Sequence, residues 1–345
     1  MILKRAKATT PRIGWYGLGS MGLPMAMNLQ RHLVKTQEPS LTYYNRTISA
    51  GETLNELGAT PAASLVDLVE RCDVIFTMLA NDKVLVETIT LLSESISQSR
   101  PLSQSQSPAP HQITLQVQTQ INIDKKIFVD CSTVHPDTTA RVSATLSDLG
   151  ATFLSAPVFG GPAIAVPGQL VFAIGGPRSG VDVVRRYIEG VMGRKVIDCG
   201  EEAKGAALLK IGGNIITLNL MEAVGEAQVF AEKTGLGTAA MEELIGESFG
   251  GVAGGYSKRL TTGIYAPPLD TRPGFGVSLA IKDAEHALSM AKDVNAKLPG
   301  TETAHRNMRA ARDYAGECLD SSSMYGVLRM EAGMPFWNEV SRQGL

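Results

Sequence analysis

The sequence has few charged residues and almost no excess of one sign. Only 19% of its 345 residues are Asp, Glu, Lys or Arg, and the formal net charge is −2. Such a chain lacks the broad positive field that attracts nucleic acid or an anionic membrane surface. We therefore expect no nucleic-acid or membrane partner, and any small-molecule ligand must be recognised by a local site.

The sequence also lacks the patterns of a disulfide framework, a metal site or a membrane span. Its five histidines form no HExxH motif, and no CxxC spacing occurs among its four cysteines, Cys72, Cys131, Cys199 and Cys318. Isolated cysteines are typical of reduced thiols in an intracellular protein. No apolar run reaches the ~18 residues of a membrane helix, and the opening MILKRAKATTPR has no apolar signal core. We expect a soluble, metal-free cytoplasmic protein, with a mitochondrial location as the alternative.

At 345 residues the chain exceeds the ~100 to 200 residues of a typical domain, so we expect two domains. Short apolar runs alternate with helical stretches from Arg12 to Asp130, and strand-like runs continue to about Cys199. This alternation predicts a doubly wound Rossmann domain over 1–199, with its sheet continuing to Cys199. A long helix is predicted from Ala203 to Thr234, and the remainder of 200–345 has no clear strands. The second domain should be all-α.

One segment interrupts the alternation. Residues 93–120 are rich in Ser, Gln and Pro, as in SESISQSRPLSQSQSPAPHQ. Their apolar content is too low to fold alone, so we expect a disordered or loosely packed surface insertion without a catalytic role.

A glycine-rich turn follows the first predicted strand and precedes a predicted helix; its residues are Gly17, Leu18, Gly19, Ser20, Met21 and Gly22. In a GxGxxG fingerprint the first two glycines allow a tight turn and close approach to a pyrophosphate. The third lets the helix pack closely on the strand. The strand–turn–helix context favours a dinucleotide site over a turn that binds nothing.

The end of the second predicted strand bears on the choice of dinucleotide. NAD enzymes usually place Asp or Glu there for the ribose hydroxyls, whereas this chain has Asn45, Arg46 and Thr47. No carboxylate repels a 2′-phosphate, and a guanidinium and a hydroxyl are present to bind one. We expect NADP(H) rather than NAD(H); the alternative is that Arg46 is a solvated surface charge.

Three further turns are candidates for the reaction site at the carboxyl edge of the sheet, where ligands bind in this architecture. They are Met78-Leu79-Ala80-Asn81, Asp130-Cys131-Ser132-Thr133 and Phe159-Gly160-Gly161. The hydroxyls of the second turn face the crevice in this interpretation, and the glycine amides of the third are suited to a carboxylate. All three also fit ordinary strand-end caps or turns.

Lys210 and Asn214 are four residues apart on the predicted long helix and therefore share one face, among small and apolar neighbours. Desolvation of a lysine there lowers its pKa toward the range useful for proton transfer. The alternative is a structural lysine whose ammonium reaches solvent.

Taken together and in order, these motifs resemble the β-hydroxyacid dehydrogenase family, which includes 3-hydroxyisobutyrate dehydrogenase and the glyoxylate and succinic semialdehyde reductases. The resemblance runs from Arg12 to about Gly316. It consists of GLGSMGLPMAMNL, MLAN, DCSTVHP, APVFGGPAIAVPGQL, GAALLKIGGN and FGVSLAIKDAEHAL.

The resemblance implies a role for each matched position. Lys210 would be the general acid/base, and Asn214 would orient the substrate. Substrate binding would involve Ser132, Phe159, Gly160 and Gly161. The nicotinamide side would be lined by Leu79, Ala80, Asn81, Thr133 and Lys282, and the 2′-phosphate would be held by Asn45, Arg46 and Thr47. It also implies homodimers or homotetramers that bury the helical domains.

Two positions depart from the family pattern. Phe159 stands where the family usually has serine, which removes a hydroxyl donor and adds an aromatic wall. Ala80 replaces the customary proline of the MLPN turn. The first change bears on substrate size and carboxylate preference.

The sequence therefore predicts an NADP(H)-dependent oxidoreductase that interconverts a small β-hydroxyacid and its semialdehyde or oxoacid in a cleft between the domains. One alternative is an imine reductase or reductive aminase, which shares the architecture and usually lacks the lysine. Another is a catalytically silent dinucleotide-binding scaffold, in which loss of Lys210 would be expected.

Overall fold

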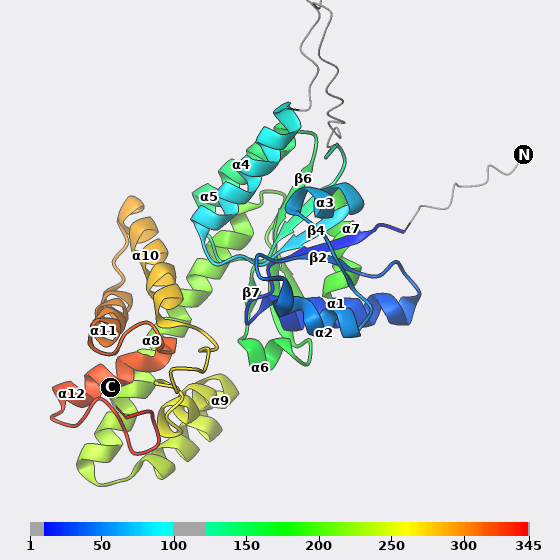
Figure 1. Cartoon of the computed structure of the whole chain (residues 1–345). Helices are drawn as coiled ribbons and strands as arrows, with labels where there is room; N and C mark the ends of the chain where they lie inside the picture. The colour runs from blue at the N-terminus through cyan, green and yellow to red at the C-terminus, as the bar shows by residue number, and fades with distance from the viewer. Residues whose placement is uncertain (1–9, 99–121, 344–345) are drawn as a thin grey trace, which may run out of the picture. The chain divides into compact units, whose positions relative to one another are not determined.

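The structure is a computed structural model that describes residues 10–98 and 122–343. It divides the chain into two compact units, Met1–Ala207 and Leu208–Leu345, drawn in Figure 1. The first contains all the strands found among the described residues, and the second, here called the helical unit, consists of helices and their connections.

The first unit is built on a six-stranded sheet in the order β3-β2-β1-β4-β5-β6. All neighbouring strands are parallel. The strands are β1 (Ile13–Tyr16), β2 (Thr42–Tyr44), β3 (Thr60–Pro61), β4 (Val74–Thr77), β5 (Ile127–Asp130) and β6 (Thr152–Ser155). Short apolar strands of this kind are expected where both faces of a sheet are covered.

Alternate residues of the strands enter two cores. Trp15 and Phe76 face the core beneath α1 (Gly22–Thr36), whereas Ile75 faces the core beneath the helices on the other face. Those helices are α3 (Leu65–Arg71), α4 (Asp82–Gln98) and α5 (Pro136–Asp148), of which α4 and α5 lie side by side in Figure 1. The period-2 alternation of a strand explains the division. Short helical segments η1 (Ile48–Gly51) and α2 (Glu52–Glu56) follow β2.

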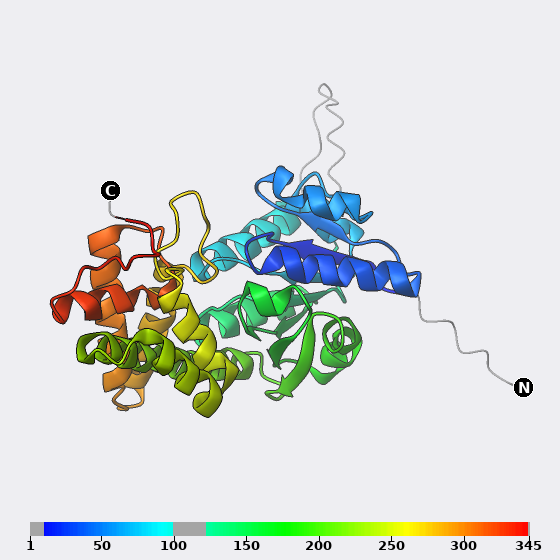
Figure 2. The ribbon, with the colours of Figure 1, turned by 90° about the horizontal axis from the view of Figure 1, so that it is seen from below.

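The prediction that one sheet continues to Cys199 is wrong. A separate three-stranded sheet, in the order β7-β8-β9, contains β7 (Val158–Phe159), β8 (Leu170–Ile174) and β9 (Gly193–Asp198). Pro157 follows β6 closely and has no amide hydrogen to extend the parallel ladder, and β7 runs antiparallel to β8. With α6 (Pro162–Ala165) and α7 (Arg178–Ile188), this sheet packs on the α1 side, as Figure 2 shows in green beside blue.

The predicted insertion begins later than expected. Helix α4 continues to Gln98, so residues 93–98 are helical rather than irregular. The residues of the insertion from 99 onward lie outside the described part of the chain.

The helical unit confirms the all-α prediction. Its elements are α8 (Lys204–Thr234, which begins in the first unit), α9 (Thr238–Thr261), α10 (Val277–Asp293), α11 (Pro299–Ala315), η2 (Ser321–Ser323) and α12 (Met324–Glu331). Helix α9 is kinked at Gly250, whose φ of 81° is not helical.

By length and composition alone, α8 is apolar enough to cross a membrane. Its buried polar side chains identify it instead as the central helix of the helical unit. Asn214 donates a hydrogen bond to Asp283 of α10, and Gln228 to Ser257 of α9. Glu222 accepts one from Asn307 of α11. Buried polar groups need such partners, so these bonds fix the position of each neighbouring helix against α8.

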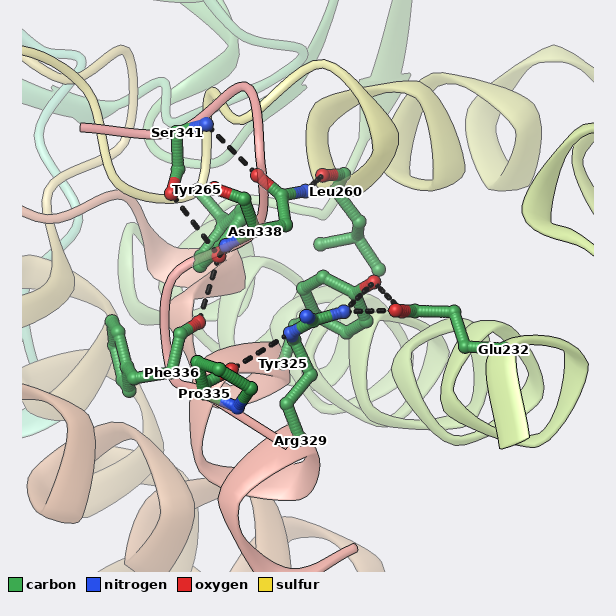
Figure 3. Close-up of polar contacts among 9 residues, drawn as sticks. All are labelled: Glu232, Leu260, Tyr265, Tyr325, Arg329, Pro335, Phe336, Asn338 and Ser341. Atoms are coloured by element: carbon green, nitrogen blue, oxygen red, sulfur yellow. Dashed lines mark hydrogen bonds and ion pairs between the residues drawn. The ribbon is translucent and has the colours of Figure 1, made fainter. Parts of the chain in front are cut away.

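Hydrogen bonds and an ion pair, drawn in Figure 3, join the C-terminal segment to the helices of the helical unit. Arg329 pairs with Glu232 and donates to the carbonyl oxygen of Pro335. The hydroxyl of Tyr265 donates to the carbonyl oxygen of Phe336 and accepts from the amide of Asn338, both at 2.8 Å. The last described residues are therefore tied to α8, to α12 and to the segment after α9.

The network around Glu222 predicts a pH-dependent stability. Glu222 is 5% exposed, and its burial raises its pKa to about 7. The folded state therefore favours the protonated carboxyl. This stabilising contribution is present below the unfolded pKa near 4.5 and is lost as pH rises through about 7.

We expect Glu222→Gln to raise the free energy of unfolding by about 1 to 3 kcal/mol near pH 8 and by much less near pH 5. The glutamine stays neutral and keeps an oxygen for Asn307. Urea unfolding at both pH values measures this, with Glu243→Gln, at an exposed position of α9, as the control. An equal gain at both pH values would contradict the assignment of the effect to Glu222 ionisation.

Candidate functional site

The glycine-rich turn brings two segments of backbone into close approach. Gly17 has φ +100°, and a Cβ at this position would lie 2.3 Å from the carbonyl oxygen of Met78. A Cβ on Gly22 would lie 2.0 Å from the carbonyl oxygen of Gly17 itself. Only glycine fits at either position, and the indole of Trp15 fixes the turn by donating to the Gly17 carbonyl at 2.9 Å.

This turn fits the pyrophosphate of a dinucleotide. It leads directly into α1, where the N-cap residue Met21 makes no side-chain cap hydrogen bond and no acidic residue lies in the first turn. The first amides of a helix carry partial positive charge and need acceptors. A bound phosphate would supply them, so the residues present suit the predicted cofactor.

The segment after β2 has a structural and an exposed part. The side chain of Asn45 accepts from the amide of Leu18 at 2.9 Å and donates to the carbonyl of Thr47 at 2.8 Å. It therefore holds the glycine turn in place. The side chains of Arg46 and Thr47 are exposed beside it, and no carboxylate occupies the end of β2.

The turns after β4 and β5 are joined to each other. The amide of Leu79 donates to the hydroxyl of Ser132 at 2.8 Å, and the amide of His135 donates to Asp82 at 2.7 Å. Asn81 accepts from the amide of Val84 and so caps α4. Asn81 is therefore an ordinary helix cap. On the same two turns, Ala80 is exposed and Thr133 is partly buried.

The third predicted turn connects β7 to α6. Phe159 is the last residue of β7 and is partly buried, and Gly160 adopts φ +116° beside Ile164 and Leu170. The carbonyl of Gly161 accepts from the amides of Ile164 and Ala165. The loop beyond is tied to α1, because Asn28 donates to the carbonyl of Ala165 at 2.8 Å.

In the helical unit, Asp283 joins two of the predicted residues. It accepts from Asn214 Nδ2 at 2.7 Å, and its other oxygen lies 2.8 Å from Lys282 Nζ. Our sequence analysis did not single out Asp283. The sequence contains no local indication of its role, because its partner Asn214 lies 69 residues away in the chain.

Lys210 lies one turn before Asn214 on α8 and is partly buried. Desolvation lowers its pKa to about 8, opposed by the negative charge of Asp283 and assisted by the positive charge of Lys282. The amine and ammonium forms are therefore both accessible near neutral pH, which a group that gives and takes protons requires.

The structure thus assembles two groups of predicted residues. The glycine turn, the segment after β2 and the turns after β4, β5 and β7 belong to the first unit, and Lys210, Asn214 and Lys282 belong to the helical unit. Asp283 adds a carboxylate to the second group.

Comparison with known families accounts for both units. Residues 12–107 and 116–200 match the model described as the NAD binding domain of 6-phosphogluconate dehydrogenase. Residues 205–328 match the model described as NAD-binding of NADP-dependent 3-hydroxyisobutyrate dehydrogenase.

Individual proteins agree along nearly the whole length. An NADH-dependent oxidoreductase of Aspergillus ustus is 33% identical over 92% of this chain and 98% of its own. The 3-hydroxyisobutyrate dehydrogenase of Pseudomonas aeruginosa is 30% identical over the same shares. The solved structure of Mycobacterium tuberculosis 3-hydroxyisobutyrate dehydrogenase with L-serine is 25% identical, covers 93% of this chain and 99% of its own, and has a TM-score of 0.69.

The fold is shared more widely. An imine reductase from Pseudomonas sp. is similar with a TM-score of 0.56 and 16% identity over 92% of this chain and 98% of its own. At this identity the likeness concerns the fold alone.

Proposed function

This chain belongs to the β-hydroxyacid dehydrogenase family of nicotinamide-dependent oxidoreductases, and on that premise we propose that it interconverts a small β-hydroxyacid and its semialdehyde or oxoacid using NADP(H). The proposal depends on the lowered pKa of Lys210. Its pKa, lowered to about 8, suits a group that exchanges a proton with the substrate oxygen near neutral pH.

In this proposal the bound nicotinamide supplies a hydride to the carbonyl carbon in one direction and accepts it in the other. During reduction the Lys210 ammonium donates a proton to the carbonyl oxygen as the C–H bond forms, and the resulting amine recovers a proton from solvent. During oxidation the neutral amine takes the hydroxyl proton. Proton transfer at this moment avoids a full negative charge on the oxygen.

Asn214 and Asp283 complete the proposed proton-transfer group. Asp283 holds the Asn214 amide through a 2.7 Å hydrogen bond, which fixes the orientation that Asn214 would offer to the substrate oxygen. The negative charge of Asp283 also keeps the pKa of Lys210 from falling further. Without it, a smaller fraction of Lys210 would be in the ammonium form at neutral pH.

We propose that the substrate carboxylate is held at Gly160 and Gly161, with Phe159 bordering the same ligand. Ser132, expected to bind substrate, is 2% exposed and its hydroxyl bonds to Asp130 and to the Leu79 amide, so any effect of Ser132 on the substrate is indirect. Phe159 brings an aromatic side chain where the family usually has a hydroxyl. This substitution favours substrates with an apolar group near the carboxylate. It is also the feature that keeps imine reduction as the second candidate, because an imine needs no hydroxyl donor of that kind.

Lys210→Met should lower kcat by about 10²- to 10⁴-fold while leaving the Kd for NADPH within about 3-fold of wild type. The substitution removes the proton donor and keeps an unbranched side chain of similar shape up to Cε. NADPH oxidation is followed with glyoxylate, succinic semialdehyde, methylmalonate semialdehyde and a cyclic imine. Lys204→Met, an exposed lysine on the same helix, is the matched control and should stay near wild type.

Turnover retained by Lys210→Met would remove the proposed proton donor. Activity with the imine alone would favour the reductive aminase alternative. Tight NADPH binding without turnover of any substrate would favour the silent scaffold.

We propose that Arg46 and Thr47 bind the 2′-phosphate and so select NADP(H). Support comes from their exposure beside Asn45 and from the absence of a carboxylate at the end of β2. The Aspergillus ustus relative is named for NADH, so this choice requires a direct test.

Arg46→Ala should raise the Kd for NADPH by about 10-fold or more, since a charged hydrogen bond is worth about 1.5 to 3 kcal/mol. The Kd for NADH should change little, because NADH carries no 2′-phosphate. Titration of both dinucleotides by fluorescence measures the two constants, and NADH serves as the internal control. Equal weakening of both would show that Arg46 does not read the 2′-phosphate.

We also propose that copies of the chain associate through α8. Leu209, Ile216, Ala223 and Phe230 are spaced seven residues apart and are all exposed, Ile216 to 70% and Phe230 to 61%. Such a spacing forms one apolar stripe along a helix, which is typical of a helix–helix interface.

Ile216→Glu should reduce the molar mass in solution toward that of a single chain, measured by light scattering after size exclusion. Val294→Glu, at an equally exposed position just after α10, is the control. An unchanged molar mass for Ile216→Glu would place any interface elsewhere.

A further inference from the structure

A buried carboxylate lies at the carboxyl end of β5, next to the turns discussed above. Asp130 is 1% exposed and pairs in register with Thr77 of β4 on one side and Ser155 of β6 on the other. The reaction proposed above gives it no chemical role. Burial of a carboxylate is costly unless hydrogen bonds compensate for the lost hydration. The hydrogen-bond partners of Asp130 therefore determine how it is tolerated in the core.

The hydrogen bonds of Asp130 converge on one oxygen. Oδ1 accepts from the hydroxyls of Thr77 and Ser132, both at 2.6 Å, and from the Ser132 amide at 3.3 Å. Oδ2 is buried and has no hydrogen-bond partner among the described residues. Burial raises the pKa of Asp130. The carboxyl group therefore acts as a one-sided acceptor that orients the hydroxyls of both Thr77 and Ser132.

Ser132 connects Asp130 to the neighbouring turn by a second hydrogen bond. Because its hydroxyl hydrogen is directed to Asp130, its lone pair is available to the amide of Leu79, which donates to it at 2.8 Å. The relay therefore runs from Asp130 through Ser132 to Leu79. It links the turn that contains Leu79 and Ala80 to the turn that contains Thr133.

We propose that Asp130 is a positioning residue for hydride transfer, acting through Ser132 on the Leu79 turn. The inference rests on the proposed function, in which Leu79, Ala80 and Thr133 lie against the nicotinamide. Hydride transfer is sensitive to small displacements of the donor, and a shift of about 1 Å can cost about 10²-fold in rate. Dinucleotide affinity depends mainly on the glycine turn and α1, so the relay should affect the rate more than the binding.

Four variants separate the relay from general stability. Ser132→Ala breaks the relay at its centre, and Asp130→Ala removes its origin. Asp130→Asn keeps an accepting Oδ1 and places an amide where Oδ2 already lacks a partner. Thr77→Val is the matched control, because it removes a 2.6 Å hydrogen bond to the same carboxylate without interrupting the path from Ser132 to Leu79.

Four quantities are measured for each variant with NADPH as the probe. They are kcat, the primary deuterium isotope effect with deuterated NADPH, the Kd for NADPH, and the near-ultraviolet circular dichroism of bound NADPH. The melting temperature is recorded alongside. The isotope effect and the dichroism report the alignment and surroundings of the nicotinamide, which a loss of stability alone does not change.

We expect Ser132→Ala and Asp130→Ala to lower kcat by about 10-fold or more, to increase the isotope effect and to alter the dichroism, with the Kd within about 3-fold of wild type. Asp130→Asn should remain within about 3-fold of wild type in kcat. Thr77→Val should lower the melting temperature and leave the kinetic values unchanged. If Asp130→Ala does not fold, Ser132→Ala and Thr77→Val still decide the matter.

The inference is overturned if Ser132→Ala changes only the melting temperature, or if Thr77→Val lowers kcat as much as Ser132→Ala does. Failure of the proposed function gives a different result from failure of this inference. If wild type reduces none of the substrates, the dichroism of bound NADPH still tests the relay, which is supported by a change in Ser132→Ala that is absent from Asp130→Asn and refuted by identical spectra.

Discussion

The architecture of the first unit depends on the close approach of two backbone segments, where Gly17 passes the carbonyl of Met78. A side chain at Gly17 would meet that oxygen at 2.3 Å, and one at Gly22 would meet the Gly17 carbonyl at 2.0 Å. Because both positions lack a Cβ, β1 can turn sharply into α1 while β4 ends directly beside it. The same contact places Met78, and therefore Leu79, next to the turn proposed to bind the pyrophosphate.

Several side chains keep this contact in one geometry. Trp15 donates to the Gly17 carbonyl, and Asn45 accepts from the Leu18 amide. In the adjoining turn, Ser132 accepts from the Leu79 amide. Each bond satisfies a backbone group that the tight turn removes from regular structure. A dinucleotide therefore meets a rigid surface, and the cost of ordering the loop upon binding is small.

Much of this organisation could be predicted from the sequence. The alternation of apolar runs and helical stretches predicted the Rossmann sheet, and the strand–GxGxxG–helix context identified the turn because its chemistry is local. The separate β7–β8–β9 sheet was missed because Leu170–Ile174 is as apolar as a strand of the main sheet. Only the proline after β6 and the reversal at Gly160 distinguish it, and both act through three-dimensional geometry. β3 was missed because it has only two residues and one is proline.

The parts of the candidate site that are close together in the sequence could be predicted, whereas a partner that is distant in the sequence could not. Lys210 and Asn214 stood out because their spacing places them on one helical face. The partner that controls both, Asp283, lies 69 residues from Asn214 in the chain and has no local signature. Asp130 was noted only as the start of a strand-end motif, since burial and one-sided hydrogen bonding are properties of the folded chain.

The two buried carboxyl groups, Asp283 and Asp130, act on their neighbours in different ways. Asp283 bonds to Asn214 and Lys282, and its charge holds the pKa of Lys210 up against desolvation. Its effect on Lys210 is electrostatic. Asp130 faces hydroxyl and amide donors, and its raised pKa shows that the ionised form is disfavoured there. What Asp130 supplies is an acceptor in a fixed direction, which an amide oxygen also provides. In the proposed mechanism, Asp283 raises the pKa of Lys210, and Asp130 orients the hydroxyl of Ser132.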